Sequence, residues 1–205
     1  MNSGNRLMTL TLSLQVCGKL SPFPDGGLVK TKSKLAVAEK YSTFGQYKAA
    51  AALLKSMREG NFNDHIYLEL FEKGEQLIDS ELECGMSQIA EKLYVFMDEE
   101  RVKVRRINNA KYLIKELNDI GISPLLPLQE NHVPLFVPIV PPNRDAVRKE
   151  MFHREIYCPV HWQLKDLNLA RGGQMAEAEL SLIIDQRYGC KEMDKILSVL
   201  YEYKE

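Results

Sequence analysis

Lys19 lies near the start of the chain, six residues before Asp25 in the turn Pro24-Asp25-Gly26-Gly27. A lysine amine can form a Schiff base with a carbonyl group when it is held, partly desolvated, at the edge of a rigid strand. The two glycines of the turn would let the backbone approach a bulky cofactor closely. The competing interpretation is a solvated loop residue, because most lysines are exposed. Residue type and spacing leave both interpretations open.

Two further side chains have chemistry suited to ligand binding. His161, in "CPVHW", could hydrogen-bond a polar ligand, or its ring could be satisfied by backbone groups beside Trp162. Arg187, in "DQRY", could clamp a carboxylate or phosphate with two parallel hydrogen bonds. Alternatively, Asp185 pairs with Arg187 and fixes the loop, and we favour this structural role for Asp185.

Other polar groups give weaker signals. The pair Arg105-Arg106 beside Asn108 and Asn109 could contact phosphate, but a solvated helix face is the favoured interpretation. We expect no metal site, because three of the histidines show no metal-ligand spacing with carboxylates or cysteines: His65, His132 and His153. The cysteines are far apart and form no CxxC pair, which predicts reduced, mostly buried thiols at Cys17, Cys84, Cys158 and Cys190.

The composition narrows the class of partner. The chain has 205 residues with 27 basic and 28 acidic side chains, a formal net charge of −1, which argues against nucleic acid or an anionic membrane as a partner. From Met8 to Val16 apolar and polar residues alternate, as in a half-buried strand and unlike the continuous core of a signal peptide. No window approaches the ~20 apolar residues of a membrane span. We expect a cytoplasmic protein.

The first half of the chain predicts a strand, a functional loop, a second strand at Leu28–Lys30, and then helices. The first helix is expected from Ser33 to about Arg58, although Gly45 weakens its middle, and the second from about Asp64 to Ser80. A third begins near residue 86 and continues through "DEERVKVRRINNAKYLIKELNDIG" to residue 121, as a long, half-solvated helix.

The second half mixes strands and helices. Prolines between residues 122 and 142 suit edge strands, and Asn143 is the predicted N-cap of a helix that turns Val147, Met151 and Phe152 inward. "YCPVHW" predicts a short strand, "GGQMAEAELSLIIDQRYG" a helical turn running into an exposed loop, and the last residues an amphipathic helix. The fold class is therefore α+β.

Several segments together resemble one enzyme family. "GKLSPFPDGG" is similar to the segment around the cofactor lysine of the DegT/DnrJ/EryC1/StrS sugar aminotransferases, which have fold type I and depend on pyridoxal phosphate. "ELFEKGEQLID" and "MSQIAEKLYVFMDEERVKVRRINNAKYL" resemble the interdomain helices of a branch of this family. "VPLFVPIV", "NRDAVRKEMFHREIYCPVHW" and "IIDQRYGCKEMDKIL" resemble its small C-terminal domain. The likeness covers nearly everything after about residue 12.

The resemblance implies a domain plan and a set of roles. It divides the chain into a remnant of the large cofactor domain (1–32), a helical interdomain segment (33–121) and a small C-terminal α+β domain (122–205). Lys19 falls on the Schiff-base lysine, which would also shuttle protons between intermediates. His161 falls on a small-domain strand facing the substrate cleft. Arg187 is the candidate for binding the carboxylate of the amino donor.

The family also implies partners. Its members exchange an amino group between glutamate and a keto-sugar nucleotide in polysaccharide biosynthesis, and they generally form homodimers. The glycine turn that cradles the phosphate of pyridoxal phosphate and the aspartate that faces its ring nitrogen precede the lysine in that family, so we expect this C-terminal half to be inactive alone.

A second hypothesis belongs to another class. Val16, Gly18 and Leu20 replace the serine, arginine and aromatic residue usual around the lysine in that branch, which favours a catalytically inactive small-domain protein that acts as a dimerising interaction module. A helix-rich nucleic-acid binder would need a basic stripe, and the near-zero net charge disfavours it.

Overall fold

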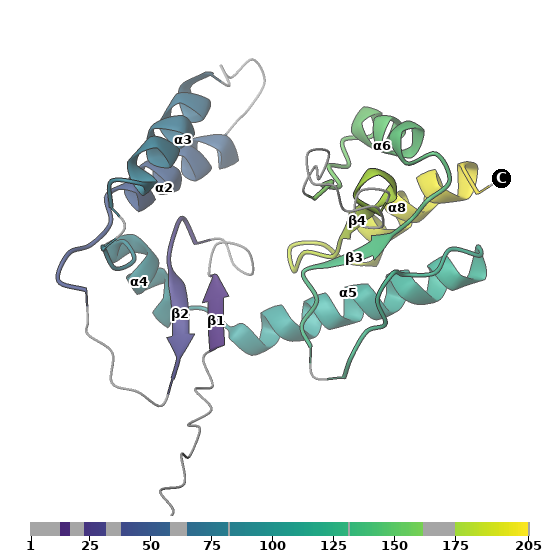
Figure 1. Ribbon diagram of the computed structural model, residues 1–205, viewed down its shortest axis with the longest axis horizontal. Helices are drawn as coiled ribbons and strands as arrows, with labels where there is room; N and C mark the ends of the chain where they lie inside the picture. Colours follow the sequence, from purple (N-terminus) through teal and green to yellow (C-terminus); the bar gives the residue numbers. More distant parts are fainter. Residues whose placement is uncertain are drawn as a thin grey trace, which may run out of the picture. The chain divides into compact units, whose positions relative to one another are not determined.

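The computed structural model describes residues 13–16, 23–31, 38–57, 65–81, 83–130, 132–161 and 175–204. Lys19 and Trp162 lie outside these residues. The fold is α+β, as the sequence predicts (Figure 1). The chain divides into two compact units, Met1–Met97 and Asp98–Glu205, which are described separately below.

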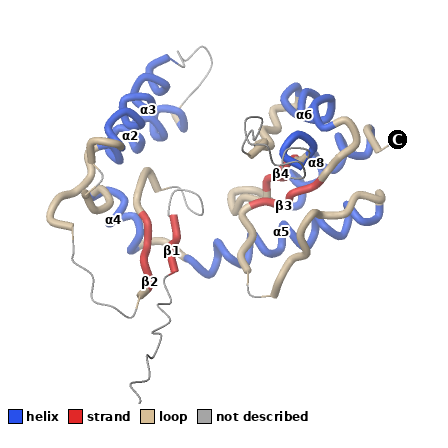
Figure 2. Tube along the Cα trace, viewed as in Figure 1, coloured by secondary structure: helices blue, strands red, loops and turns tan. Residues whose placement is uncertain are grey.

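The first unit begins with the predicted strand, loop and strand. Strand β1 (Ser13–Val16) pairs antiparallel with β2 (Gly27–Lys30), and both strands are drawn in red in Figure 2. The register places Val16 opposite Gly27. Ten residues, which include Lys19, lie between these partners in the sequence.

The first helix is much shorter than the sequence predicts. Helix α2 spans Phe44–Ser56, whereas the apolar pattern predicts a start at residue 33. Residues 38–43 are not helical, because Tyr41 forms a β-bridge with Gly85 and the amide of Ser42 donates to the carbonyl of Gly85 at 3.0 Å. The weak position noted at Gly45 thus lies at the beginning of the helix and not in its middle.

Helix α3 (His65–Ile78) packs against α2 through small and polar residues. Gly74 is buried, and a Cβ there would lie 3.0 Å from the Lys48 side chain and 3.2 Å from the Phe44 carbonyl oxygen. Lys48 also pairs with Glu75 at 2.7 Å. Phe71 is 48% exposed. Close backbone approach and charge pairing therefore join the two helices.

The long helix predicted from residue 86 is divided. Helix α4 (Gln88–Val95) has Ser87 as its N-cap, and α5 (Glu99–Asp119) begins again at Asp98, whose carboxylate accepts from the Arg101 amide at 2.9 Å. An aspartate in this position satisfies the free amides of a new helix start, so the chain is not helical between the two. The C-terminal end agrees with the prediction, since Gly121 follows α5 with a φ of 80°.

The second unit surrounds a two-stranded sheet. Strand β3 (Phe136–Ile139) pairs antiparallel with β4 (Leu180–Ile183). Helix α5 packs against β3 and α8 (Cys190–Glu202), and α6 (Arg144–His153) packs against α8 (Figure 1). Their apolar faces form one core, which includes Leu113, Leu117, Val137, Ile139, Val147, Met151, Leu180, Leu182, Met193, Ile196, Val199 and Leu200.

Three expectations for this unit meet different outcomes. Asn143 is confirmed as the N-cap of α6, accepting from the Ala146 amide at 3.3 Å. Phe152 does not turn inward, because its ring meets the Tyr157 ring at a tilt of 44°, with 5.6 Å between ring centroids, and it stays 39% exposed. The strand predicted at residues 157–162 lies instead at 180–183, where an exposed loop was expected.

The displaced strand has a physical reason. Pro159 lacks an amide donor, so the segment before His161 makes only one backbone bond to β4, from the Ser181 amide to the Pro159 carbonyl at 3.2 Å. The segment Leu180–Ile183 has the sequence Leu-Ser-Leu-Ile, and its first three residues are buried, so three of its four side chains are apolar and suit a strand against the core.

Candidate functional site

The carboxylate of Asp25 joins the end of the lysine loop to two helices. It is 6% exposed and accepts hydrogen bonds from the Ser87 amide at 2.8 Å, from the Ser87 hydroxyl at 2.7 Å, and from the Ser42 hydroxyl. The Ser87 hydroxyl in turn accepts from the Ala90 amide at 3.3 Å as the N-cap of α4. We call Asp25, Ser42 and Ser87 the aspartate clamp.

The aspartate clamp lies where two helices begin. Ser42 precedes α2 and Ser87 precedes α4, so the carboxylate sits beside two helix N-termini, where the macrodipole favours negative charge. Gly45, in the first turn of α2, leaves the necessary space, since a Cβ there would lie 2.5–2.7 Å from the Asp25 carboxylate atoms. The clamp therefore requires glycine at position 45.

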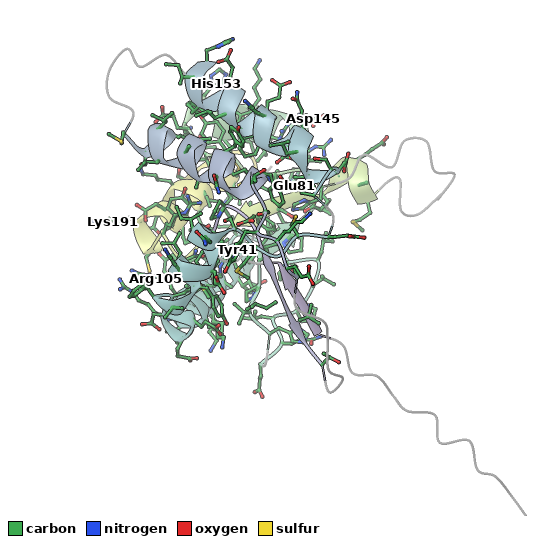
Figure 3. All side chains as sticks on the ribbon, turned by 90° about the vertical axis from the view of Figure 1, so that its left-hand side faces the viewer. Tyr41, Glu81, Arg105, Asp145, His153 and Lys191 are labelled. Carbon is green, nitrogen blue, oxygen red and sulfur yellow. The ribbon has the colours of Figure 1, made fainter. Side chains whose placement is uncertain are left out.

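A second carboxylate caps α2 from outside the clamp. Glu81 accepts from the amides of Thr43 at 2.7 Å and Phe44 at 3.1 Å, and from the Thr43 hydroxyl. The Thr43 hydroxyl bond is the largest cause that lowers the pKa of Glu81, and the two amide bonds add to it. Glu81 and Tyr41 of this unit are labelled in Figure 3.

The clamp gives the lysine loop a fixed C-terminal end. Asp25 and Gly26 hold residues 23–26 in place. The φ of Gly26 is 99°, and a Cβ added at Gly26 would lie 2.9 Å from the Met86 Cβ. Lys19 precedes this anchored segment in the chain but lies outside the described residues. The Gly-Gly turn, interpreted from the sequence as room for a cofactor, thus has a packing role at Gly26 against Met86.

His161 lies in the second unit. Its ring is 4.9 Å from the Phe136 ring, centroid to centroid, and the residue is half-buried. The aromatic contact comes from β3, on the side of the sheet opposite the core-facing Val137 and Ile139. His161 therefore has a packing partner within the chain, and the Trp162 contact considered from the sequence lies outside the described residues.

Arg187 pairs with Asp185, as one of the two sequence interpretations expects. Its guanidinium donates to the two carboxylate oxygens of Asp185 at 2.8 and 3.1 Å, and its amide donates at 2.9 Å. Burial acts to raise the pKa of Asp185, but the hydrogen bonds and charge of Arg187, with the charge of Arg106, lower it overall. The Arg187 side chain remains 67% exposed, so it can still meet a ligand.

The interpretation of Arg106 and Asn109 as part of a solvated face is wrong. Both are 2% exposed, and Arg106 donates to Gln186 at 2.7 Å and to the Leu135 carbonyl at 3.2 Å while lying 3.5 Å from Asp185. The Asn109 amide donates to the backbone of the β4–α8 connection, at Ile184, Asp185 and Tyr188. These two side chains therefore fix the turn that carries Arg187.

A periodic signal for these buried residues was present in the sequence. Arg106 and Asn109 share one helix face with Ala110, Leu113 and Leu117, at spacings of three and four. A charge on an apolar face indicates a buried, paired group and not a solvated one. Arg105, one position earlier, is exposed, and it is labelled on the helix in Figure 3.

The three predicted site residues are distributed over the two units. Lys19 belongs to the first unit, and His161 and Arg187 to the second. Within the second unit, His161 contacts Phe136 of β3, whereas Arg187 lies in the turn between β4 and α8 and pairs with Asp185. In the described ranges, no group of three histidine, cysteine, aspartate or glutamate side chains is placed to hold a metal ion.

The cysteines only partly follow the expectation of buried thiols. Cys158 is buried and Cys84 half-buried, but Cys190 at the start of α8 is exposed, and all three are free thiols. Burial raises the pKa of the Cys158 thiol to about 11. None of the helices in the described ranges combines the length and the apolar character that crossing a bilayer requires.

No protein-family model matches the chain, and comparison with curated proteins and with solved structures gives no significant match either. The function proposed below therefore rests on the residues and contacts of this chain and on the resemblance of its sequence segments.

Proposed function

We propose that this chain is the C-terminal portion of a pyridoxal-phosphate-dependent aminotransferase that acts on a keto-sugar nucleotide, with Lys19 as the lysine that attaches the cofactor. The supporting observation is the anchoring of the loop. Its ends are the paired residues Val16 and Gly27, and Asp25 ties its C-terminal end to two helices. A nucleophilic lysine works best on such a preorganised support.

The described residues beside the loop do not fit the remaining parts of the cofactor. The ring nitrogen of pyridoxal phosphate needs a free carboxylate, but both oxygens of Asp25 already accept from Ser42 and Ser87. The same bonds occupy the two serine hydroxyls, which otherwise could meet the phosphate. Partners for the ring nitrogen and the phosphate must therefore come from residues beyond this clamp, and we expect no turnover by the chain alone.

We further propose that His161 and Arg187 contact substrate from the second unit. Arg187 is exposed and its five donors are only partly used by Asp185, so it can bind the glutamate carboxylate. His161 can hydrogen-bond the sugar nucleotide while its ring rests on Phe136.

Covalent trapping tests the role of Lys19. The full chain is combined with the large domain that supplies the ring-nitrogen and phosphate partners, mixed with an excess of pyridoxal 5′-phosphate, reduced with borohydride and digested. The phosphopyridoxyl adduct on each lysine is then quantified by mass spectrometry. We expect Lys19 to carry several times more adduct than the exposed Lys111 and Lys191. A Lys19→Arg variant, matched in charge, should lose that adduct alone. Equal labelling of Lys19 and the exposed lysines would refute the proposal.

A second candidate function is a self-associating interaction module, and the first unit carries the observation that favours it. Among its described residues, the apolar side chains that are buried are only Phe23, Ala51 and Ala90. Large apolar side chains are exposed at Leu53, Met57, Ile66, Leu68, Phe71, Ile89, Leu93, Val95 and Phe96. Apolar surface on this scale indicates a protein partner. A strictly monomeric chain at high concentration in light scattering would count against this candidate.

A further inference from the structure

Three arginines surround the turn between β4 and α8. Arg105 and Arg106 belong to α5, and Arg187 belongs to the turn itself. Arg106 is buried and lies 3.5 Å from the Asp185 carboxylate, to which Arg187 donates at 2.8 and 3.1 Å. Burial, the largest cause, lowers the pKa of Arg106, and the charge of Arg187 lowers it further, although Asp185 acts in the opposite direction. One aspartate therefore faces two guanidinium groups, and positive charge is in excess.

A second carboxylate at the turn does not remove this excess. Glu192 accepts from the Gly189 amide at 2.9 Å, and this bond is the largest cause that lowers the pKa of Glu192. The charges of Lys195 and Lys191 add to the lowering, so two lysines already lie near this carboxylate. The positive charge of the arginines is thus left for an external anion.

Arg105 lies against Gly189 with its donors available. The side chain is exposed, and it forms no ion pair with the described part of the chain (Figure 3). A Cβ at Gly189 would lie 3.7 Å from Arg105 Nη1 and 3.9 Å from Glu192 Oε2. Because glycine has no side chain, the space beside the Arg105 guanidinium stays open to a ligand.

Arg187 approaches the same glycine from the turn. It precedes Gly189 by two residues, so their Cα atoms are at most about 7 Å apart. Its side chain is 67% exposed, and its bonds to Asp185 use only Nε and Nη2. Arg106 and Asn109 hold the turn from below through backbone carbonyls, which preorganises it. Two guanidinium groups are therefore presented near one glycine, and each matches the geometry of a phosphate group.

We propose that Arg105 and Arg187 bind the two phosphate groups of a diphosphate. A diphosphate carries more negative charge and more acceptor oxygens than a carboxylate, so it can engage both guanidinium groups at once. Its source is the nucleotide-linked keto-sugar, and this identification rests on the proposed function. Arg187 then meets the glutamate carboxylate and the diphosphate in separate half-reactions, because the two substrates of an amino-group exchange enter in turn.

Calorimetric titration of the full chain with inorganic pyrophosphate at low ionic strength tests the site. Arg105→Gln removes both the charge and the planar donor group, whereas Arg105→Lys keeps the charge and removes only the planar group. The matched control is Lys111→Gln, which removes one charge at an exposed position of α5 that helical spacing places on a different face. Thermal unfolding of each variant checks that it folds.

We expect the natural chain to bind pyrophosphate and Arg105→Gln to bind it about tenfold more weakly, the loss of one charge-assisted contact. Arg105→Lys should also bind more weakly than the natural chain, and the control should bind as the natural chain does. Absence of binding to the natural chain, full affinity in Arg105→Lys, or equal weakening in the control would overturn the proposal.

Competition distinguishes the two sources of a diphosphate. Uridine diphosphate glucose should displace pyrophosphate, and uridine, which has no phosphate, should not. If the nucleotide sugar failed to compete, the nucleotide source would be refuted. These titrations involve neither Lys19 nor pyridoxal phosphate. A chain that is labelled at Lys19 and does not bind pyrophosphate would therefore overturn this inference alone, and the reverse result would refute only the aminotransferase proposal and the source drawn from it.

Discussion

Gly45→Ala should destabilise the first unit even though alanine is the better helix former. In the structure a Cβ at this position would lie 2.5 Å from Asp25 Cγ and 2.6 and 2.7 Å from its two oxygens. All three distances are shorter than real contacts to a Cβ allow, and the neighbour is a buried, hydrogen-bonded carboxylate. The carboxylate must therefore move, and its bonds to Ser42 and Ser87 cannot all survive.

The cost follows from those bonds. Hydrogen bonds to a charged group contribute about 1.5–3 kcal/mol each, so losing one or two of the three costs about 3 kcal/mol. The higher helix propensity of alanine returns about 1 kcal/mol. We therefore expect a net loss of about 2 kcal/mol in the free energy of opening of α2 and α4.

Native-state hydrogen exchange resolved by mass spectrometry measures this loss in the first unit alone. Faster exchange is expected in α2 and α4 and not in α5 or α8, because the clamp belongs to Met1–Met97. Gln46→Ala is the matched control, since Gln46 is an exposed neighbour in the same helix. If Gly45→Ala were as stable as this control or more stable, the requirement for glycine would be refuted.

Three further predictions concern other groups. Arg106→Ala should cost about 3–5 kcal/mol in urea unfolding of the second unit, because Asp185 and backbone carbonyls lose a buried partner; a loss below 1 kcal/mol would contradict this. Cys190 should react with a thiol reagent at neutral pH while Cys158, with a pKa of about 11, reacts only on unfolding. The pKa of Glu81 is lowered in the folded state, so Glu81 stabilises the folded chain at pH values above the ordinary glutamate pKa. This stabilisation is lost as the pH falls through the lowered pKa of Glu81. Glu81→Gln should remove that part of the acid dependence of unfolding, and an unchanged acid limb would contradict it.

The sequence predicted correctly those elements whose signals lie in neighbouring residues. The pair of strands around the lysine loop, the Asn143 cap and the end of α5 at Gly121 follow from alternation and from capping chemistry. The start of α2 could not be predicted in this way. It depends on Glu81 and Gly85, about forty residues later, which bind the backbone before the helix. Apolar spacing carries no information about such distant partners.

In the candidate site, too, contacts between residues near in sequence were predicted and contacts between distant residues were missed. That Arg187 pairs with Asp185 was one of two interpretations, because the two residues are near in sequence. The aspartate clamp was missed, since Asp25 and Ser87 are 62 residues apart and nothing local connects them. Arg106 was misjudged because its charge was weighed without its helix face. Long-range polar contacts, more than element types, are what the sequence left undetermined.

The most direct test of the central claim is the sequence of the source DNA immediately upstream of the Met1 codon. We predict that an open frame there, continuous with this one or in a neighbouring gene, encodes a glycine-rich phosphate-binding turn and the aspartate for the ring nitrogen of pyridoxal phosphate. An in-frame stop codon, with no large-domain partner encoded nearby, would contradict the aminotransferase assignment and leave the interaction module as the function to pursue.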